Sequence, residues 1–249
     1  MNIHEAIILV GGKGTRLQSI INDRPKPMAE VAGRPFVEWL LLRLKSQGIQ
    51  HIILCTNYLG EVIEMYFGNG RHWNLEIDYA REPGLLGTAG AVRHAVSKIR
   101  SDRFLVLNGD SYCHMDISRL EQIHCTWGAR ATLWLAKVSD SSRYGSVEIG
   151  INGVVQSFRE KQTQKTPGFI NAGVYLLERN VVEAIPAGCV FSIERDIFPQ
   201  LIGHGLYAVA GDEIFLDIGT PESYAAAEQF FASHVLTLAR HHRRIKGEE

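Results

Sequence analysis

The sequence predicts an α/β protein with a Rossmann-like, mixed but mainly parallel central sheet flanked by helices. In the first part of the chain, short apolar runs alternate with segments of helical periodicity, which is typical of right-handed βαβ units in a parallel sheet. From Ala131 onward, strand-like runs follow one another across short turns. This second pattern indicates antiparallel strands in a mixed sheet beside the first half.

The first predicted element is a buried strand that leads into a glycine-rich loop. The stretch Ala6–Leu17 reads AIILVGGKGTRL, and its apolar run has no polar alternation, as in a strand covered on both faces. Because the loop follows that strand, we expect it at the carboxyl edge of the sheet, where open α/β folds bind ligands.

The next elements follow from local periodicity. Helical spacing of apolar residues, with Gly48 ending one segment, predicts helices, and β-rich apolar runs predict strands. In the first half the expected helices are Phe36–Gln47, Glu61–Phe67 and Gly90–Ile99, and the expected strands are His51–Thr56, Leu75–Ala80 and Arg103–Leu107.

In the second half, the dipeptide Asn152-Gly153 predicts a tight hairpin turn between two strands. The last three expected elements are a helix, a short strand and a second helix. The expected strands are Ala131–Lys137, Ser146–Ile149, Val154–Arg159, Phe169–Leu177 and Ile214–Leu216, and the expected helices are Ile193–Ile202 and Pro221–Val235.

Composition limits the class of protein. The 249 residues, 45% hydrophobic and 21% charged, suit one large domain. The formal net charge of −1 gives no electrostatic sign of a nucleic-acid or membrane partner, and the N-terminal apolar run is too short for a signal or a membrane span. The scattered cysteines indicate reduced thiols and a cytoplasmic location; they are Cys55, Cys113, Cys125 and Cys189.

The glycine loop does not fit the two common phosphate-binding motifs. The residues after Gly11 do not supply a Walker A loop, and Leu17 stands where a dinucleotide fingerprint needs its third glycine. Backbone N–H groups and the planar donors of Arg16 would still suit an anion; the alternative is an ordinary strand-to-helix turn. Lys26, between Pro25 and Pro27, is either presented stiffly to a ligand or a solvated loop lysine.

The motifs GGKGTRL and PKPM, taken with those further along, resemble the sugar-1-phosphate nucleotidyltransferases, also called sugar-nucleotide pyrophosphorylases. Within that family, RPKPM and GRPFVEWLL look most like the small guanylyltransferases acting on D-glycero-α-D-manno-heptose 1-phosphate, with mannose-1-phosphate guanylyltransferases close behind. The later motifs, in the family's order, are LGTAGAV at Leu86–Val92, NGD at Asn108–Asp110, YG at Tyr144–Gly145, REK at Arg159–Lys161, NAGVY at Asn171–Tyr175 and DIGTPESY at Asp217–Tyr224.

The resemblance implies one nucleotidyltransferase domain over residues 1–235. A nucleotide-binding half would run to about 130, a sugar-phosphate-binding half would span 131–235, and a charged tail would cover 236–249. We expect that tail to be a frayed, solvated end. The sequence is compatible with a homo-oligomer and with a monomer, because the last helix could pack on a partner or face solvent equally well.

The implied reaction joins a nucleoside triphosphate to a sugar 1-phosphate and releases pyrophosphate. The nucleophile is an ionised phosphate oxygen, so the ten histidines need no catalytic role, and catalysis depends on positioning and electrostatics. By resemblance, Arg16 would grip the leaving phosphates, Lys26 would lie by the α-phosphorus and Lys161 would bind the sugar phosphate. Asp110 and Asp217 would hold Mg²⁺; without the resemblance they read as a turn aspartate and a neighbour of a helix cap.

Substrate-binding residues are also implied. Glu82 is the sharpest candidate for base recognition, because a carboxylate can accept both the N1–H and N2–H donors of guanine, whereas uracil and thymine offer one; the alternative is a surface residue. Asp196 would join the sugar contacts unless it serves the dipole of a helix capped by Ser192. The other expected contacts are Gly11, Gly12, Lys13, Gly14, Thr15, Gly87 and Thr88 for the nucleotide and Gly145, Glu160 and Asn171 for the sugar.

The function predicted from the sequence is therefore nucleotidyl transfer from GTP to a sugar 1-phosphate, with the manno-configured heptose phosphate first and mannose 1-phosphate next. A uridylyl- or thymidylyltransferase is the main competitor. A catalytically inactive regulatory subunit that senses sugar nucleotides would be expected to lack Arg16, Lys26, Asp110 or Asp217, all of which are present. An oxidoreductase is disfavoured by the missing third glycine.

Overall fold

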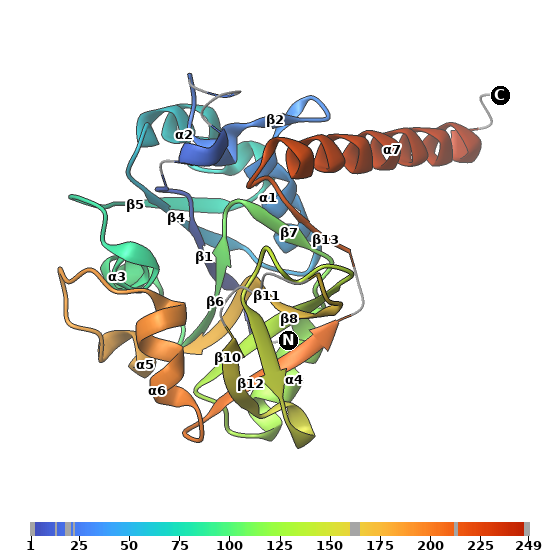
Figure 1. The fold of residues 1–249 in the computed structure, drawn as a ribbon. Coiled ribbons are helices and arrows are strands. Elements are labelled where there is room, and N and C mark those ends of the chain that lie inside the picture. The colour runs from blue at the N-terminus through green and yellow to red at the C-terminus, as the bar shows by residue number, and fades with distance from the viewer. Residues whose placement is uncertain are drawn as a thin grey trace.

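The computed structural model describes residues 3–12, 14–17, 21, 23–159, 165–211 and 214–246. Within these ranges, the structure has a nine-stranded sheet (Figure 1). Seven strands follow the order β10-β9-β11-β6-β1-β4-β5, and of the remaining two, β8 pairs with β11 and β12 pairs with β8. Its strands are β1 Glu5–Leu9, β4 His51–Thr56, β5 Glu76–Arg81, β6 Arg103–Asn108, β8 Ala131–Val138, β9 Ser146–Ile149, β10 Val155–Arg159, β11 Gly168–Glu178 and β12 Leu206–Gly211.

The sheet combines parallel and antiparallel parts, as the sequence predicted. Strands β5, β4, β1 and β6 run parallel, whereas β11 pairs antiparallel with β6, β8 and β9. The predicted hairpin turn joins β9 and β10, with Asn152 at φ 61° and Gly153 at φ 75°. The predicted fold class is therefore confirmed.

Apolar residues on alternate positions of the central strands build two cores, one on each face of the sheet. Ile8 and Leu54 belong to the core covered by α1, α2, α4 and α7, while Ile7 and Ile53 belong to the core covered by α3, α5 and α6. This follows from the alternation of side chains along a strand. The helices are α1 Phe36–Ser46, α2 Gly60–Phe67, α3 Gly87–Ala95, α4 Ile117–Thr126, α5 Arg179–Glu183, α6 Phe198–Leu201 and α7 Pro221–Lys246.

Two sequence expectations about helices need refinement. The predicted helix Ile193–Ile202 consists of a π-helical turn over Ile193–Ile197 followed by α6. The final helix, α7, continues beyond the predicted end at Val235 to Lys246. Figure 1 shows α7 extending away from the rest of the molecule. None of the described helices is long and apolar enough to cross a membrane.

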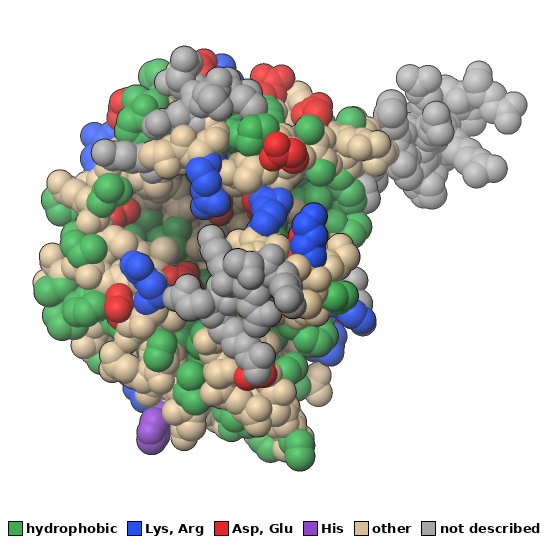
Figure 2. Space-filling model, viewed as in Figure 1, with side chains coloured by type: hydrophobic (Ala, Val, Ile, Leu, Met, Phe, Trp, Pro, Cys, Tyr) green, Lys and Arg blue, Asp and Glu red, His purple; other side chains and the backbone are tan. Residues whose placement is uncertain are grey.

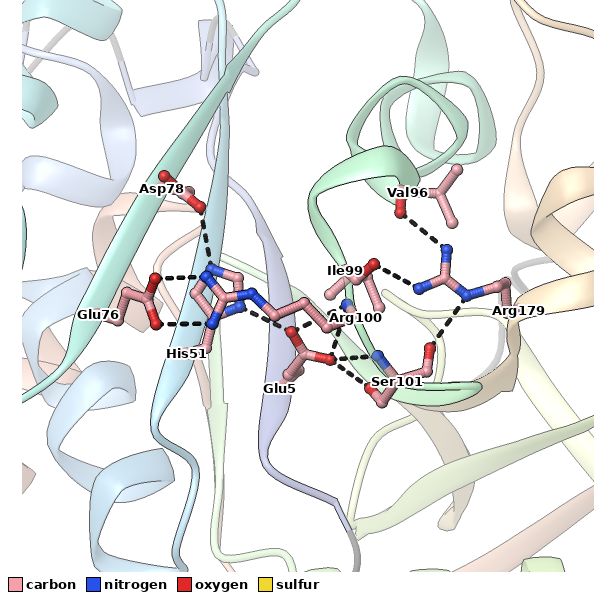
Figure 3. Close-up of polar contacts among 9 residues, drawn as sticks. All are labelled: Glu5, His51, Glu76, Asp78, Val96, Ile99, Arg100, Ser101 and Arg179. Atoms are coloured by element: carbon pink, nitrogen blue, oxygen red, sulfur yellow. Dashed lines mark hydrogen bonds and ion pairs between the residues drawn. The ribbon is translucent and has the colours of Figure 1, made fainter.

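A polar network ties together the amino ends of the parallel strands (Figure 3). The Glu5 carboxylate accepts hydrogen bonds from the backbone N–H groups of Arg100 and Ser101 and lies 2.7 Å from Nδ1 of His51. The other ring nitrogen of His51 is 3.1 Å from Asp78. These residues come from β1, β4, β5 and the segment before β6. The network therefore connects the amino ends of these strands, whereas the glycine loop lies at the carboxyl end of β1.

Candidate active site

Two cavities adjoin at the carboxyl ends of the parallel strands. The first, of about 410 Å³, lies against the glycine loop and α3, and the second, of about 1270 Å³, lies over β11, β13 and the segment before β9. Figure 2 shows Lys and Arg side chains gathered about a hollow on this face. The residues that line both cavities are Arg16, Lys26, Asn108, Asp110 and Gly219.

The glycine loop forms one wall of the first cavity. Gly11, Gly12, Gly14, Thr15 and Arg16 all line it, because β1 ends at Leu9 and delivers the loop to the carboxyl edge. Gly14 has φ +58°, and a Cβ atom there would lie 2.6 Å from Cβ of Lys26. The loop can therefore pack against Lys26 only where Gly14 has no side chain.

Lys26 lies at the junction of the two cavities. Pro25 precedes a 3₁₀ turn over Lys26–Met28 and has extended backbone angles, with the φ that its ring fixes. The Lys26 side chain is 11% exposed, and its Nζ lies 2.6 Å from Oδ2 of Asp110. This places a cation beside a carboxylate between the two cavities.

Asp110 and Asp217 are brought together by a short antiparallel ribbon. β7 (Ser111–Cys113) pairs with β13 (Phe215–Asp217), so that Asp217 lies opposite Ser111. The N–H of Ile218 donates to the backbone carbonyl of Asp110 at 3.0 Å. Two carboxylates far apart in the chain thus become neighbours, and both line the second cavity. Their oxygens are hard donors, which fit a magnesium ion that is also held by phosphate oxygens.

Asp217 is held firmly on its ribbon. Its Oδ1 accepts a hydrogen bond from the Tyr144 hydroxyl at 2.5 Å. Its Oδ2 accepts from the Gly219 N–H at 2.8 Å and the Ser223 hydroxyl at 3.2 Å, and lies 3.4 Å from the Arg143 guanidinium. Burial, and then the hydrogen bond to Asp217 and its charge, raise the pKa of Tyr144 far above its ordinary value. The hydroxyl therefore keeps its proton and acts as a donor.

Glu82 lies at the end of β5 on the wall of the first cavity. The residue is 8% exposed, and its Oε2 accepts a hydrogen bond from the Leu86 N–H at 3.2 Å. Burial raises the pKa of this carboxyl above its ordinary value, against the lowering effect of that hydrogen bond. A Cβ atom on Gly11 would lie 2.8 Å from Oε1, so Gly11 leaves room for the carboxylate.

A chain of hydrogen bonds links the two cavities through Glu194. The Thr88 hydroxyl at the start of α3 donates to Oε2 of Glu194 at 2.9 Å, and the buried Tyr175 hydroxyl donates to Oε1 at 3.0 Å. Tyr175 in turn accepts from Asn171 at 2.8 Å. Gly87 and Thr88 line the first cavity, and Gly145, Asn171, Tyr175 and Glu194 line the second.

Asp196 is placed differently from the sequence expectation. Among the described residues that line the two cavities, Glu194 is present and Asp196 is not. The Asp196 carboxylate accepts from the Ser192 N–H at 2.6 Å, and the Ser192 hydroxyl accepts from the Arg195 N–H. Asp196 thus serves the start of the π-helical turn, which is the alternative that the sequence left open.

Several lining residues were missed by the sequence reasoning. Tyr144 was quoted only as part of a motif, and Arg143, Glu194 and Arg195 were not singled out, although all of these residues line the second cavity. In a helical turn, residues two apart such as Glu194 and Asp196 point to different sides, so only one of the two was to be expected in the cleft. Lys13, Glu160 and Lys161 lie outside the described residues.

One other cluster of metal-ligand type exists among the described residues. His51, Glu76 and Asp78 bring their donor atoms within 4.8 Å of one another. They lie at the amino ends of the strands, away from both cavities, and Glu76 is ion-paired with Arg100 at 2.5 Å. This cluster therefore does not bear on the metal expected at Asp110 and Asp217.

Comparison with known proteins gives concordant matches. A nucleotidyl transferase family model matches residues 5–234. The chain is 40% identical over 223 residues, 88% of its length, to a mannose-1-phosphate guanylyltransferase of Mycobacterium tuberculosis, but spans only 62% of that protein. It is 37% identical over 226 residues to D-glycero-alpha-D-manno-heptose 1-phosphate guanylyltransferase of Aneurinibacillus thermoaerophilus, covering 90% of this chain and 97% of the relative.

A solved structure gives the same result. The crystal structure of HddC from Yersinia pseudotuberculosis complexed with GMP-PN superposes with a TM-score of 0.82 at 35% identity, covering 92% of this chain and 100% of that one. The likeness thus extends over nearly the whole chain and includes the strands and loops that build both cavities.

Proposed function

Because the chain belongs to the nucleotidyl transferase family, we propose that it transfers a guanylyl group from GTP to a sugar 1-phosphate, forming a GDP-sugar and pyrophosphate. D-glycero-α-D-manno-heptose 1-phosphate is the first candidate acceptor, since two guanylyltransferases for this sugar phosphate are 37% and 38% identical to the chain over 226 and 220 residues and the RPKPM and GRPFVEWLL motifs resemble theirs. Mannose 1-phosphate is the second candidate, from the mannose-1-phosphate relative at 40% identity. The family resemblance predicted from the motifs is confirmed.

One observation supports this proposal: a cation and a carboxylate line both cavities, and a second carboxylate lines the second cavity next to them. A bisubstrate transfer needs the triphosphate and the sugar phosphate on opposite sides of one reacting phosphorus. Lys26 and Asp110 line both cavities, and the β7–β13 ribbon sets Asp217 beside them. The two substrates would therefore meet at this junction.

The proposed chemistry is positioning and charge stabilisation. The sugar phosphate oxygen is already ionised near neutral pH, so the attack needs no general base. Lys26 would neutralise charge at the α-phosphoryl group, and Arg16 with the N–H groups of the glycine loop would stabilise the leaving pyrophosphate. The predicted roles of Lys13 in nucleotide binding and of Lys161 on the sugar phosphate stay predictions.

Mg²⁺ fits the donor set of Asp110 and Asp217. When bound, it would supply Lewis-acid stabilisation of phosphate oxygens. Both carboxylates are anchored by hydrogen bonds from neighbouring groups, which keeps their oxygens in place. A cytoplasmic location and any oligomer stay predictions.

Base selection would depend on Glu82 at the wall of the first cavity. Its carboxylate has acceptor capacity beyond the Leu86 N–H, and guanine offers adjacent N1–H and N2–H donors. On the sugar side, Asn171 and the backbone at Gly145 would contact hydroxyl groups, with Glu160 as a further predicted contact. Glu194 lines the second cavity and Asp196 is not among its lining residues, so Glu194 rather than Asp196 would contact the sugar.

The first test is pyrophosphate release by the purified chain with Mg²⁺. GTP, UTP, dTTP, CTP and ATP are each paired with heptose, mannose and glucose 1-phosphates, and Lys26→Met serves as the inactive control. Release with GTP and the heptose phosphate supports the proposal. Release with GTP and mannose 1-phosphate would mean that mannose 1-phosphate is the acceptor. Release with a nucleotide of another base would mean that Glu82 does not select guanine. If every pair is inactive, a nucleotide-sensing regulatory protein becomes the better explanation.

A further inference from the structure

The segment before β9 contacts Asp217 at the wall of the second cavity. Tyr144 follows a turn in which its N–H donates to the carbonyl of Ser141 at 3.0 Å. Its ring packs edge-on against Phe215 with centroids 5.5 Å apart. Phe215 and Asp217 are two residues apart on β13 and therefore share one face of that strand. Tyr144 covers this face with its ring and reaches Asp217 with its hydroxyl.

The two carboxylate oxygens of Asp217 have different surroundings. Oδ2 faces the Gly219 N–H, the Ser223 hydroxyl and the Arg143 guanidinium. A carboxylate oxygen has about two lone-pair sites, so these donors occupy Oδ2. The Tyr144 hydroxyl at 2.5 Å is the one donor found on Oδ1 among the described residues. Oδ1 thus keeps a lone pair.

From this asymmetry we propose, on the basis of the proposed function, that Oδ1 is the Asp217 atom that binds the divalent cation and that Tyr144 is a positioning residue for it. The hydroxyl of Tyr144 fixes the carboxylate plane by holding one side of Oδ1. Tyr144 is followed directly by Gly145, the predicted sugar contact. The same short segment therefore connects the sugar side of the cleft to the metal carboxylate.

The test uses Tyr144→Phe, which removes the hydroxyl and keeps the ring that packs on Phe215. Tyr207→Phe is the matched control, because Tyr207 stacks on Trp127 at a ring distance of 6.2 Å and lines neither cavity among the described residues. Mn²⁺ binding to the full chain is titrated by electron paramagnetic resonance of the free ion, with GTP present. Thermal unfolding verifies that each variant is folded.

We expect Tyr144→Phe to weaken Mn²⁺ binding about tenfold or more, the usual effect of removing a group that orients a metal ligand, and Tyr207→Phe to leave it unchanged. The Mg²⁺ concentration for half-maximal rate rises in parallel, while the KM for the sugar phosphate stays near wild type. Because Tyr144 acts through Asp217, adding Tyr144→Phe to Asp217→Asn has no further effect on Mn²⁺ affinity.

Two results overturn the inference: unchanged Mn²⁺ affinity in Tyr144→Phe, or an additive loss in the double variant. A raised KM for the sugar phosphate with normal metal dependence also overturns it and makes Tyr144 a sugar contact. If Mn²⁺ binds to Asp217 and weakens in Tyr144→Phe as expected, but no substrate pair turns over, the proposed function fails and the inference stands.

Discussion

Replacement of Gly14 by alanine tests whether the glycine loop sets the position of Lys26. Gly14 has φ +58°, a conformation that costs an L-residue about 1–2 kcal/mol. The new Cβ would also lie 2.6 Å from Cβ of Lys26 and 3.2 Å from its Cδ. Since these are stem atoms close to the backbone, the loop or the Lys26 turn must shift.

Two measurable losses follow for Gly14→Ala. The strain alone predicts a melting temperature lower by about 2–8 °C, at about 2–4 °C per kcal/mol for a chain of this size. A shift of Lys26 by about 1 Å relative to the reacting phosphorus would lower kcat by about a hundredfold. Thermal unfolding and initial rates of pyrophosphate release with GTP measure the two effects separately.

Gly12→Ala is the matched control in the same loop. A Cβ on Gly12 meets no atom within 4 Å and requires no positive φ, so its stability should stay within about 0.5 kcal/mol of wild type. If its methyl group obstructs the nucleotide, KM for GTP rises rather than kcat falling. A Gly14→Ala protein as stable and as active as Gly12→Ala would refute the reasoning.

Three further predictions concern carboxylates. Asp110→Asn should abolish Mg²⁺-dependent turnover with little change in melting temperature, and full activity in this variant would remove Asp110 from the metal site. Glu82→Gln should reduce the ratio of kcat/KM for GTP over UTP by about tenfold or more, since a hydrogen bond to a charged group contributes about 1.5–3 kcal/mol; an unchanged ratio would count against base recognition by Glu82. Burial alone would raise the pKa of Glu5, but hydrogen bonds from Ser101, His51 and two backbone N–H groups hold it below its ordinary value of 4.5. Glu5 therefore stabilises the fold above that value and loses its contribution as pH falls through the lower folded value, so urea unfolding between about pH 5 and pH 3 should show a weaker pH dependence in Glu5→Gln than in wild type.

Local sequence was sufficient for the central parallel strands and the glycine loop. The run Ala6–Val10 is apolar at every position, and β1 lies between two parallel neighbours with both faces buried. Strong periodicity and turn chemistry act within a few residues, which is why the Asn152-Gly153 hairpin was also predicted correctly.

Elements supported by distant partners were missed or shortened. β12 was not predicted, because its stretch LYAVAG contains Gly211 and two alanines and becomes a strand by pairing with β8. β7 has only three residues, too few to give a periodic signal, and was not predicted, whereas β13 was predicted one residue early at Ile214–Leu216. The pairing of β7 with β13 depends on packing between segments far apart in the chain.

By itself the sequence determined the family and predicted the chemistry of the site, because the residue types and their order match a pattern of cations for phosphates and carboxylates for a metal. Only the tertiary structure decided which atoms meet. In the tertiary structure, Lys26 is ion-paired with Asp110 and Asp217 pairs with Ser111. Glu194, and not Asp196, is among the residues that line the second cavity. The reason is physical: hydrogen-bond geometry operates over about 3 Å, and no local pattern fixes two segments of a chain to that tolerance.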